Sequence, residues 1–157
     1  MALRVGHGFD IHRLQQGGHL LLGGVVVAEG MSPVAHSDGD VVIHALVDAL
    51  LGAVGRGDIG EHFPDTDAAW KGAASSQFLE KVMADLRAEG WAVVNADVTI
   101  MAERPRIKSF KPKMVAHLKS LMDCEINVKA GTNEGCDAVG RGEAIAAHAV
   151  VLIQRRQ

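Results

Sequence analysis

The sequence predicts an α/β fold of the α+β kind, in which one mixed β-sheet carries helices on one face. Three observations lead to this prediction. The 157 residues are the usual length of one domain, so a single domain is expected over 1–157. Apolar residues recur at helical spacing in 38–53 and alternate with polar residues in 92–102. The predicted order is β, hairpin, α, α, β, α, β, β, which fits one sheet covered by helices.

The boundaries of the individual elements follow from periodicity and from turn residues. Strands are expected at 2–6, 20–22, 25–27, 92–102, 126–130 and 144–153. Helices are expected at 38–53, 76–89 and 112–123. Polar, basic or glycine-rich loops are expected at 58–71, 103–111 and 131–142.

Turn and capping residues support several of these elements. Gly23-Gly24 lies between two short apolar runs, which predicts a two-residue hairpin turn. Ser37 or Asp38 can cap the first helix, because their side chains accept hydrogen bonds from free amides of the first turn. Ser75 or Ser76 can cap the second helix in the same way.

The composition excludes several classes of protein. A net charge of −3 is unusual for a general nucleic-acid binder. The chain has no tyrosine and only 4% aromatic residues, so it lacks the aromatic surface on which the bases of single-stranded nucleic acid stack. The apolar runs are too short to span a bilayer, and no secretory signal is visible. We therefore expect a cytoplasmic protein with reduced Cys124 and Cys136 and with no nucleic-acid or membrane partner.

Asp10 and His12 are the first candidate metal ligands. In an extended segment, residues two apart point the same way, so both side chains can reach one ion. His44, on the first predicted helix, is the best candidate for a third ligand. Two histidines and one carboxylate leave a fourth position open, as in catalytic zinc sites. The alternative is a surface Asp-x-His and a helical histidine bonded to a neighbouring side chain.

Two further segments could hold the phosphates and hydroxyls of a substrate. His36 and Ser37 precede the first helix, where free amides and the helix dipole attract anions. The alternative there is a plain helix cap. Asp58, Asp65 and Asp67 lie in the following loop and suit the hydroxyls of a polyol, unless they form only a solvated acidic loop.

The second half of the chain offers a basic loop and a glycine-rich loop. The basic residues are Arg104, Arg106, Lys108, Lys111 and Lys113. In an acidic protein they favour a small phosphorylated ligand, and a solvated loop is the alternative. Thr132 and nearby amides could hold a phosphate, and Glu134 a second divalent ion. The dinucleotide fingerprint and the Walker A motif are both missing.

These motifs occur in an order that resembles the 2-C-methyl-D-erythritol 2,4-cyclodiphosphate synthase family of the non-mevalonate isoprenoid pathway. The segments that carry the resemblance are Gly6-His7-Gly8-Phe9-Asp10-Ile11-His12, Ala35-His36-Ser37-Asp38-Gly39-Asp40-Val41 with His44-Ala45, Gly57-Asp58-Ile59-Gly60, Phe63-Pro64-Asp65-Thr66-Asp67, Lys71-Gly72-Ala73, Asn127-Val128-Lys129-Ala130, Thr132-Asn133-Glu134 and Gly140-Arg141-Gly142-Glu143. They are spread over essentially the whole chain.

The resemblance implies a homotrimer with active sites between adjacent subunits. It implies one zinc ion per subunit on Asp10, His12 and His44, and a magnesium or manganese ion on Glu134. Substrate phosphates would contact His36 and Ser37, with His36 and Thr132 stabilising the transition state. The erythritol would contact Asp58, Gly60, Phe63, Asp65 and Asp67. The nucleotide would contact Ala102, Pro105, Arg106, Ile107, Lys108, Gly131, Thr132 and Asn133.

The implied reaction is an intramolecular phosphoryl transfer by a phosphorus–oxygen lyase. The 2-phosphate of 4-diphosphocytidyl-2-C-methyl-D-erythritol 2-phosphate attacks the β-phosphorus, and CMP leaves. The product is 2-C-methyl-D-erythritol 2,4-cyclodiphosphate. The main obstacle is repulsion between two phosphates, which bound cations and positioning reduce.

The sequence departs from the family pattern near the expected trimer axis. Arg141 and Glu143 remain there, but Ala138 replaces an aromatic residue that lines an isoprenoid-binding cavity in many members.

The sequence is also compatible with two rival functions. One is a zinc phosphohydrolase that uses water, with Asp58 as its base. The other is a non-catalytic module that binds a nucleotide or an isoprenoid diphosphate.

Overall fold

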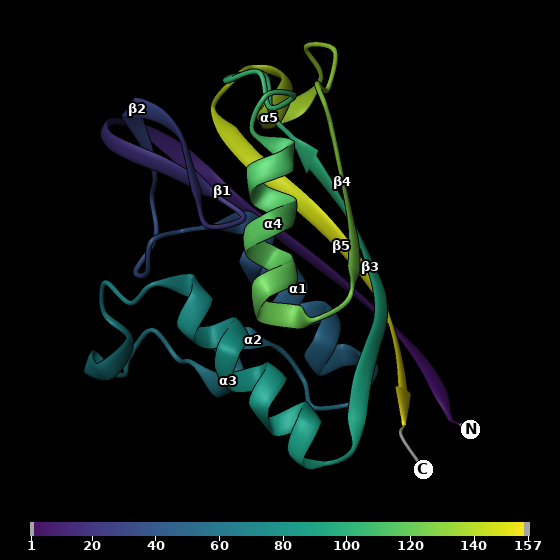
Figure 1. Cartoon of the computed structure of the whole chain (residues 1–157). Coiled ribbons are helices and arrows are strands. Elements are labelled where there is room, and N and C mark those ends of the chain that lie inside the picture. Colours follow the sequence, from purple (N-terminus) through teal and green to yellow (C-terminus); the bar gives the residue numbers. More distant parts are fainter. Residues whose placement is uncertain (1, 156–157) are drawn as a thin grey trace.

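Five strands form one sheet in the computed structural model, which describes residues 2–155 (Figure 1). The strands are β1 (Leu3–Leu22), β2 (Val25–Pro33), β3 (Trp91–Met101), β4 (Glu125–Gly131) and β5 (Ala144–Arg155). Their order is β2-β1-β5-β3-β4. β3 and β4 are parallel, and the other neighbours are antiparallel. The prediction of one mixed sheet is confirmed.

Three longer helices cover one face of this sheet, as predicted (Figure 1). They are α1 (Val41–Ala53), α3 (Ser75–Ala88) and α4 (Lys111–Met122). Three short elements lie in segments predicted to be loops: α2 (Ile59–His62), the 3-10 helix η1 (Ala68–Trp70) and α5 (Asp137–Gly140). α1 is the innermost helix, with eleven of its thirteen residues buried. No helix within residues 2–155 is both long and apolar enough to cross a membrane.

β1 is much longer than the predicted strand at 2–6. Residues 3–13 pair with β5, and residues 14–16 and 19–22 pair with β2. Neighbouring strands therefore support most of the twenty residues of β1, although residues 12–19 lack the alternating apolar pattern that signals a strand. The Gly23-Gly24 turn leads into β2, which confirms the hairpin.

The opposite face of the sheet carries exposed apolar side chains along β1 and β5, and no helix within residues 2–155 covers it (Figure 1). Leu3, Val5, Phe9 and Ile11 project from alternate positions of β1, and Val150 projects from β5. Val5 is 67% exposed, and the other four are at least 43% exposed. Because exposed apolar surface of this extent is unusual on a monomer, this face is a candidate contact surface between chains.

The start of α1 is capped by Asp40, whereas the sequence predicted Ser37 or Asp38 as the cap. The buried Asp40 carboxylate accepts hydrogen bonds from the amides of Val42 and Ile43, both at 3.1 Å. It also accepts from Gly23 at 2.9 Å and from Gly24 at 2.7 Å. One side chain thus joins the β1–β2 turn to α1. The predicted serine cap of the second helix is also wrong, because Ala74 precedes α3 and makes no side-chain cap.

We expect Asp40→Asn to lower the free energy of unfolding by about 1–3 kcal/mol, since an amide nitrogen would replace one accepting oxygen and face an N–H group. Chemical denaturation measures this change. Asp67→Asn is the matched control, because Asp67 is exposed and accepts one amide, from Ala69 at 2.9 Å. It should change stability by less than about 1 kcal/mol. Equal losses in the two variants would contradict the role given to Asp40.

Candidate metal centre and flanking pockets

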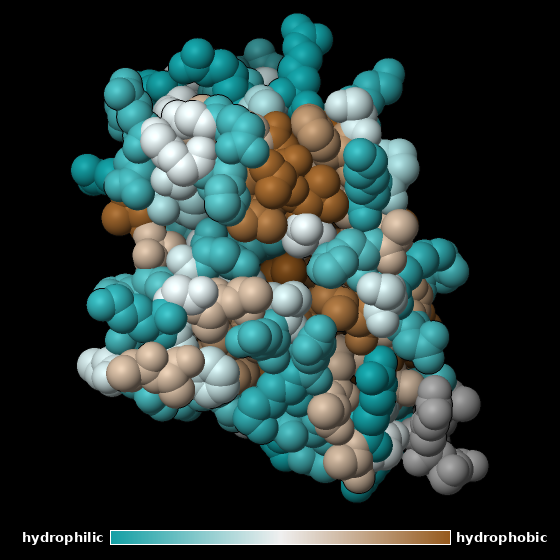
Figure 2. Space-filling model, turned by 60° about the vertical axis from the view of Figure 1, so that its left-hand side comes forward, coloured by the Kyte–Doolittle hydropathy of each residue, from teal (hydrophilic) through white to brown (hydrophobic). Residues whose placement is uncertain are grey.

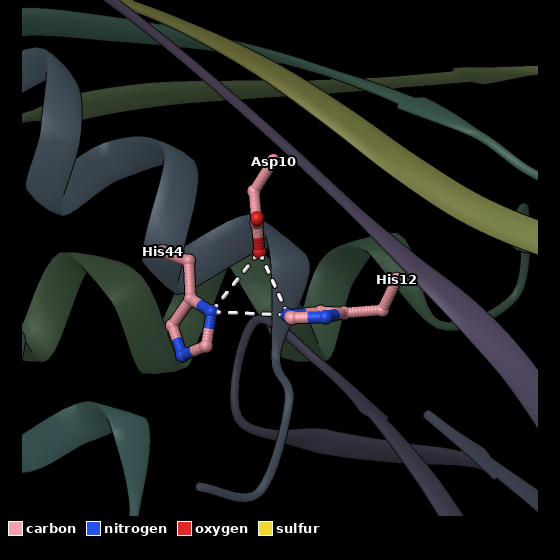
Figure 3. A group of neighbouring side chains, drawn as sticks. All are labelled: Asp10, His12 and His44. Atoms are coloured by element: carbon pink, nitrogen blue, oxygen red, sulfur yellow. Dashed lines mark hydrogen bonds and ion pairs between the residues drawn. The ribbon is translucent and has the colours of Figure 1, made fainter. Parts of the chain in front are cut away.

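Three ligand side chains from β1 and α1 meet at one point (Figure 3). Asp10 and His12 point from β1 toward α1, and His44 lies in the first turns of α1. Asp10 Oδ2 is 2.9 Å from His12 Nε2 and 3.0 Å from His44 Nδ1. The two histidine nitrogens are 3.3 Å apart. The structure therefore brings together the three residues that the sequence singled out.

The dimensions of this triad suit a small divalent ion. Ligands at about 2.0–2.1 Å from a tetrahedral ion lie about 3.3–3.4 Å from one another. The three separations of 2.9, 3.0 and 3.3 Å are close to this spacing. Two imidazoles and one carboxylate are also a ligand set that leaves a fourth position for substrate. The residues present thus fit a catalytic zinc ion.

Two glycines of β1 determine how closely α1 approaches the triad. Gly6 and Gly8 are on the same side of β1 as Asp10, directly under α1. A Cβ atom at Gly6 would be 1.8 Å from the carbonyl oxygen of Ala49, and one at Gly8 would be 1.9 Å from that of Ala45. Only glycine allows this approach, which places His44 within reach of Asp10. The Gly6-x-Gly8 pattern therefore serves helix packing here.

The negative charge of Asp10 and the positive charge of protonated His44 stabilise each other. Burial opposes ionisation of Asp10, but hydrogen bonds from His12 and His44 and their charge hold its pKa well below the usual range. Burial likewise opposes protonation of His44, but the hydrogen bond and charge of Asp10 raise its pKa above the ordinary value. Without a metal, the site is thus stabilised by a His44–Asp10 ion pair.

This ion pair predicts a pH dependence of the metal-free protein. Because the His44 pKa is raised, its contribution to stability is fully present below about pH 6.5 and is lost as pH rises through the raised value. On the acid side, the Asp10 contribution is present above about pH 3.9 and is lost as pH falls through its lowered pKa. The difference in unfolding free energy between the wild type and His44→Gln should therefore be largest below about pH 6.5 and shrink as the pH rises above it. Chemical denaturation of both proteins in the presence of a chelator measures this difference. A difference that grows as the pH rises would contradict the His44–Asp10 ion pair.

A cleft of about 550 Å³ opens beside the triad. Figure 2 shows this side of the molecule, with a hollow near mid-height and apolar surface in and above it. Besides the triad, the cleft is lined by Val34, Ala35, His36, Ser37, Ile59, Gly60, Phe63, Pro64, Asp65, Trp70, Lys71 and Phe78. His36, Ser37, Gly60, Phe63 and Asp65 were candidates from sequence. Trp70 and Phe78, whose rings pack around Phe63, were not.

Asp58 and Asp67, also predicted to contact substrate, act locally as helix caps. Asp58 Oδ1 accepts from the Glu61 amide at 3.1 Å, and Asp67 Oδ1 accepts from Ala69 at 2.9 Å. Neither is among the residues that line the cleft. Asp58 still lies directly before Ile59 and Gly60, which do line it.

A second pocket, of about 670 Å³, lies between the loop after β3 and the end of β4. Its lining residues are Ala102, Glu103, Pro105, Arg106, Ile107, Lys108, Lys111, Ala130, Gly131 and Thr132. It shares no residue with the first cleft. With three basic side chains, this pocket suits an anionic ligand. Seven of the eight predicted nucleotide residues line it, and Asn133, the eighth, does not.

Glu134 and Asn133 lie just beyond this pocket. Glu134 Oε1 accepts a hydrogen bond from Thr132 Oγ1 at 3.2 Å. The backbone amide of Asn133 donates to Glu103 Oε1 at 2.9 Å. The Glu134 backbone has a φ of +52°, which is an uncommon conformation for a residue other than glycine. The predicted ligand of the second cation is therefore adjacent to Thr132 at the end of β4.

The residues expected at a trimer axis lie near a third pocket of about 420 Å³. Ala138 and Glu143 line it, together with Ile11, Arg13, Leu14 and Ala144. Arg141 is not among the lining residues, and its Nε donates to Glu143 at 3.0 Å. Both side chains of this ion pair are exposed to solvent.

Sequence reasoning missed a buried residue behind the triad. Ser75, at the start of α3, is fully buried, and its hydroxyl lies 2.8 Å from His44 Nε2. It was expected only as a possible helix cap. No local signal identifies it, because Ser75 and His44 are 31 residues apart.

Known proteins resemble this chain over nearly its full length. The sequence model of the YgbB family matches residues 3–154. A protein named 2-C-methyl-D-erythritol 2,4-cyclodiphosphate synthase, from Chromohalobacter salexigens, is 51% identical over 156 residues, covering 98% of this chain and 96% of that protein. The bifunctional IspDF from Campylobacter jejuni has a TM-score of 0.95 at 40% identity, covering 99% of this chain and 43% of that chain. The CDP complex of IspF from Plasmodium falciparum has a TM-score of 0.86 at 28% identity, covering 99% and 97%. The chain therefore belongs to the YgbB family.

Proposed function

We propose that the chain converts 4-diphosphocytidyl-2-C-methyl-D-erythritol 2-phosphate to 2-C-methyl-D-erythritol 2,4-cyclodiphosphate and CMP, in isoprenoid precursor biosynthesis. The observation that carries this proposal is the convergence of Asp10, His12 and His44 in a cleft that His36 and Ser37 also line. The synthase name of a relative at 51% identity supports the reaction, and the CDP complex of the Plasmodium falciparum protein supports the substrate class.

Asp10, His12 and His44 would hold a zinc ion, and Glu134 a magnesium or manganese ion. Bound cations supply a Lewis acid that offsets the charge of the diphosphate. His36 and Ser37 bind phosphate oxygens at the cleft, while Arg106 and Lys108 attract the nucleotide phosphates to the second pocket. Thr132 and His36 stabilise the charge that develops as the phosphoryl group is transferred.

No protein base is required, because the attacking phosphate is already ionised near neutral pH. The chain mainly contributes positioning. A flexible substrate must fold until its own phosphate reaches the β-phosphorus, and ordering of this kind can contribute up to roughly 7–11 kcal/mol. The apolar rings of Phe63, Trp70 and Phe78 at the cleft limit access of water to the reacting groups.

The active unit is proposed to be a homotrimer with sites between adjacent subunits. The uncovered apolar face of the sheet supports association, since burial of Leu3, Val5, Phe9, Ile11 and Val150 is favourable. The separation of the phosphate cleft from the basic pocket fits a substrate held by two subunits. The free thiols Cys124 and Cys136 fit the cytoplasm as the predicted compartment.

Phosphorus NMR of the reaction products tests the proposal. With zinc and magnesium supplied, the cytidylyl substrate should yield a cyclic diphosphate and CMP in equal amounts. A 2,4-bisphosphate with CMP would instead identify a hydrolase, because attack of water on the β-phosphorus leaves two separate phosphates on the erythritol. Tight CDP binding without turnover would identify a binding module, and either result would overturn the proposal.

A further inference from the structure

The imidazole of His44 has a different kind of partner on each nitrogen. Nδ1 faces Asp10 and His12, whereas Nε2 lies 2.8 Å from Ser75 Oγ and 3.2 Å from Ser37 Oγ. A neutral imidazole carries a proton on one nitrogen and a free lone pair on the other. His44 can therefore bind a metal through Nδ1 only while its proton is on Nε2.

The hydrogen bonds of Ser75 determine which way its hydroxyl points. Its Oγ donates to Asp38 Oδ1, and its backbone amide donates to Asp38 Oδ2 at 2.8 Å. A hydroxyl has a single hydrogen, so once that hydrogen is given to the carboxylate only lone pairs remain for His44. Ser75 must then accept the proton of His44 Nε2. Because Ser75 is fully buried, water cannot replace it as the acceptor.

Ser37 is a weaker candidate for the same role. Its oxygen is 0.4 Å farther from Nε2, since the two distances are 3.2 and 2.8 Å. It accepts from the Gly39 amide at 3.3 Å, and it lines the cleft. Its hydroxyl hydrogen is not committed to a carboxylate, so it can rotate toward a ligand in the cleft.

We propose that Asp38 and Ser75 are positioning residues, which keep the proton of His44 on Nε2 and direct its Nδ1 lone pair to the metal position. The arrangement joins two helices and a loop, because Asp38 precedes α1, His44 lies on α1 and Ser75 begins α3. Groups that hold the distal nitrogen of a metal-bound histidine typically change metal affinity 10–100-fold when removed. The inference rests on the metal site of the proposed function but not on the reaction.

The test compares Ser75→Ala with Ser37→Ala, which removes the second hydroxyl near the same nitrogen. Zinc dissociation constants come from competition with a chromophoric chelator. We expect Ser75→Ala to raise the constant about 10–100-fold and Ser37→Ala to change it less than about 3-fold. Ser75→Thr keeps the hydroxyl and should restore most of the affinity. Ser75→Cys fills the same space with a weak acceptor and should resemble alanine, which serves if Ser75→Ala does not fold.

A second readout separates proton positioning from a merely structural role. In the zinc-loaded wild type, ¹⁵N NMR should show a slowly exchanging Nε2 proton on His44, and the same signal in Ser75→Thr. It should be lost or exchange rapidly in Ser75→Ala. Unchanged zinc affinity in folded Ser75→Ala, or an equal loss in Ser37→Ala, would overturn the inference. Absence of zinc binding in the wild type would instead overturn the metal site itself.

Discussion

His44→Ala is expected to abolish zinc binding and turnover while the fold is retained. The change removes one of three ligands, so the loss in affinity should exceed the 10–100-fold typical of residues behind a ligand. The fold should persist because His44 lines the cleft, whereas the core of α1 consists of apolar residues such as Leu46 and Leu50. Zinc content per chain, circular dichroism and CMP release measure the three quantities. Asp10→Ala should behave in the same way.

His62→Ala is the control for this prediction. His62 is exposed, its Nε2 bonds to the carbonyl of Arg56, and it does not line the cleft. We expect wild-type zinc content and CMP release from this variant. Normal CMP release by zinc-free His44→Ala would refute the metal role of the triad.

Gly8→Ala is expected to damage both the fold and the metal site. The new Cβ would be 1.9 Å from the carbonyl oxygen of Ala45 and 2.8 Å from the amide nitrogen of Ala49. Both atoms belong to the backbone of α1, so the helix must move away from β1. We expect a loss of about 3 kcal/mol or more in unfolding free energy. Because His44 moves with the helix, zinc affinity should fall as well.

Gly52→Ala is the matched control on α1. A Cβ there has its nearest neighbour, the His7 carbonyl oxygen, at 3.9 Å. Alanine favours a helix interior over glycine by about 0.5–1 kcal/mol, so this variant should be slightly more stable. Urea denaturation at one protein concentration measures both variants. Equal stability of Gly8→Ala and Gly52→Ala would contradict the close packing of α1 on β1.

Part of the triad could be predicted from the sequence because it depends on a local rule. Residues two apart share a face of a strand, which placed Asp10 and His12 together. His44 was chosen because it lies on a helix whose start contains Asp38 and Asp40. The family resemblance supported the choice. The structure agrees, because Gly6 and Gly8 let this helix lie directly on the strand.

Contacts between distant segments were not predictable from one sequence. Asp40 lies in an acidic helix start, but its amide partners at Gly23 and Gly24 are 17 and 16 residues away. Ser75 was expected as a cap, whereas its hydroxyl serves His44 and Asp38. Neither role has a local pattern, since each depends on how the chain folds back on itself.

The extent of β1 was missed for a similar reason. Its middle contains glycine, histidine and glutamine residues that give no alternating apolar signal, and it is a strand because β5 and β2 pair with its two halves. The short α2 was missed because four residues are too few for periodicity to show. Both errors concern the segments that line or flank the cleft.

X-ray absorption at the zinc edge tests the central claim most directly. For zinc-loaded protein, we expect one ion per chain with two imidazole nitrogens and oxygen ligands at about 2.0–2.2 Å. An analogue of the diphosphate should place an oxygen at the fourth position and add phosphorus scattering from beyond the ligand atoms. Sulfur ligands at about 2.3 Å, or a spectrum unchanged in His44→Ala, would show that the ion lies elsewhere and would contradict this account.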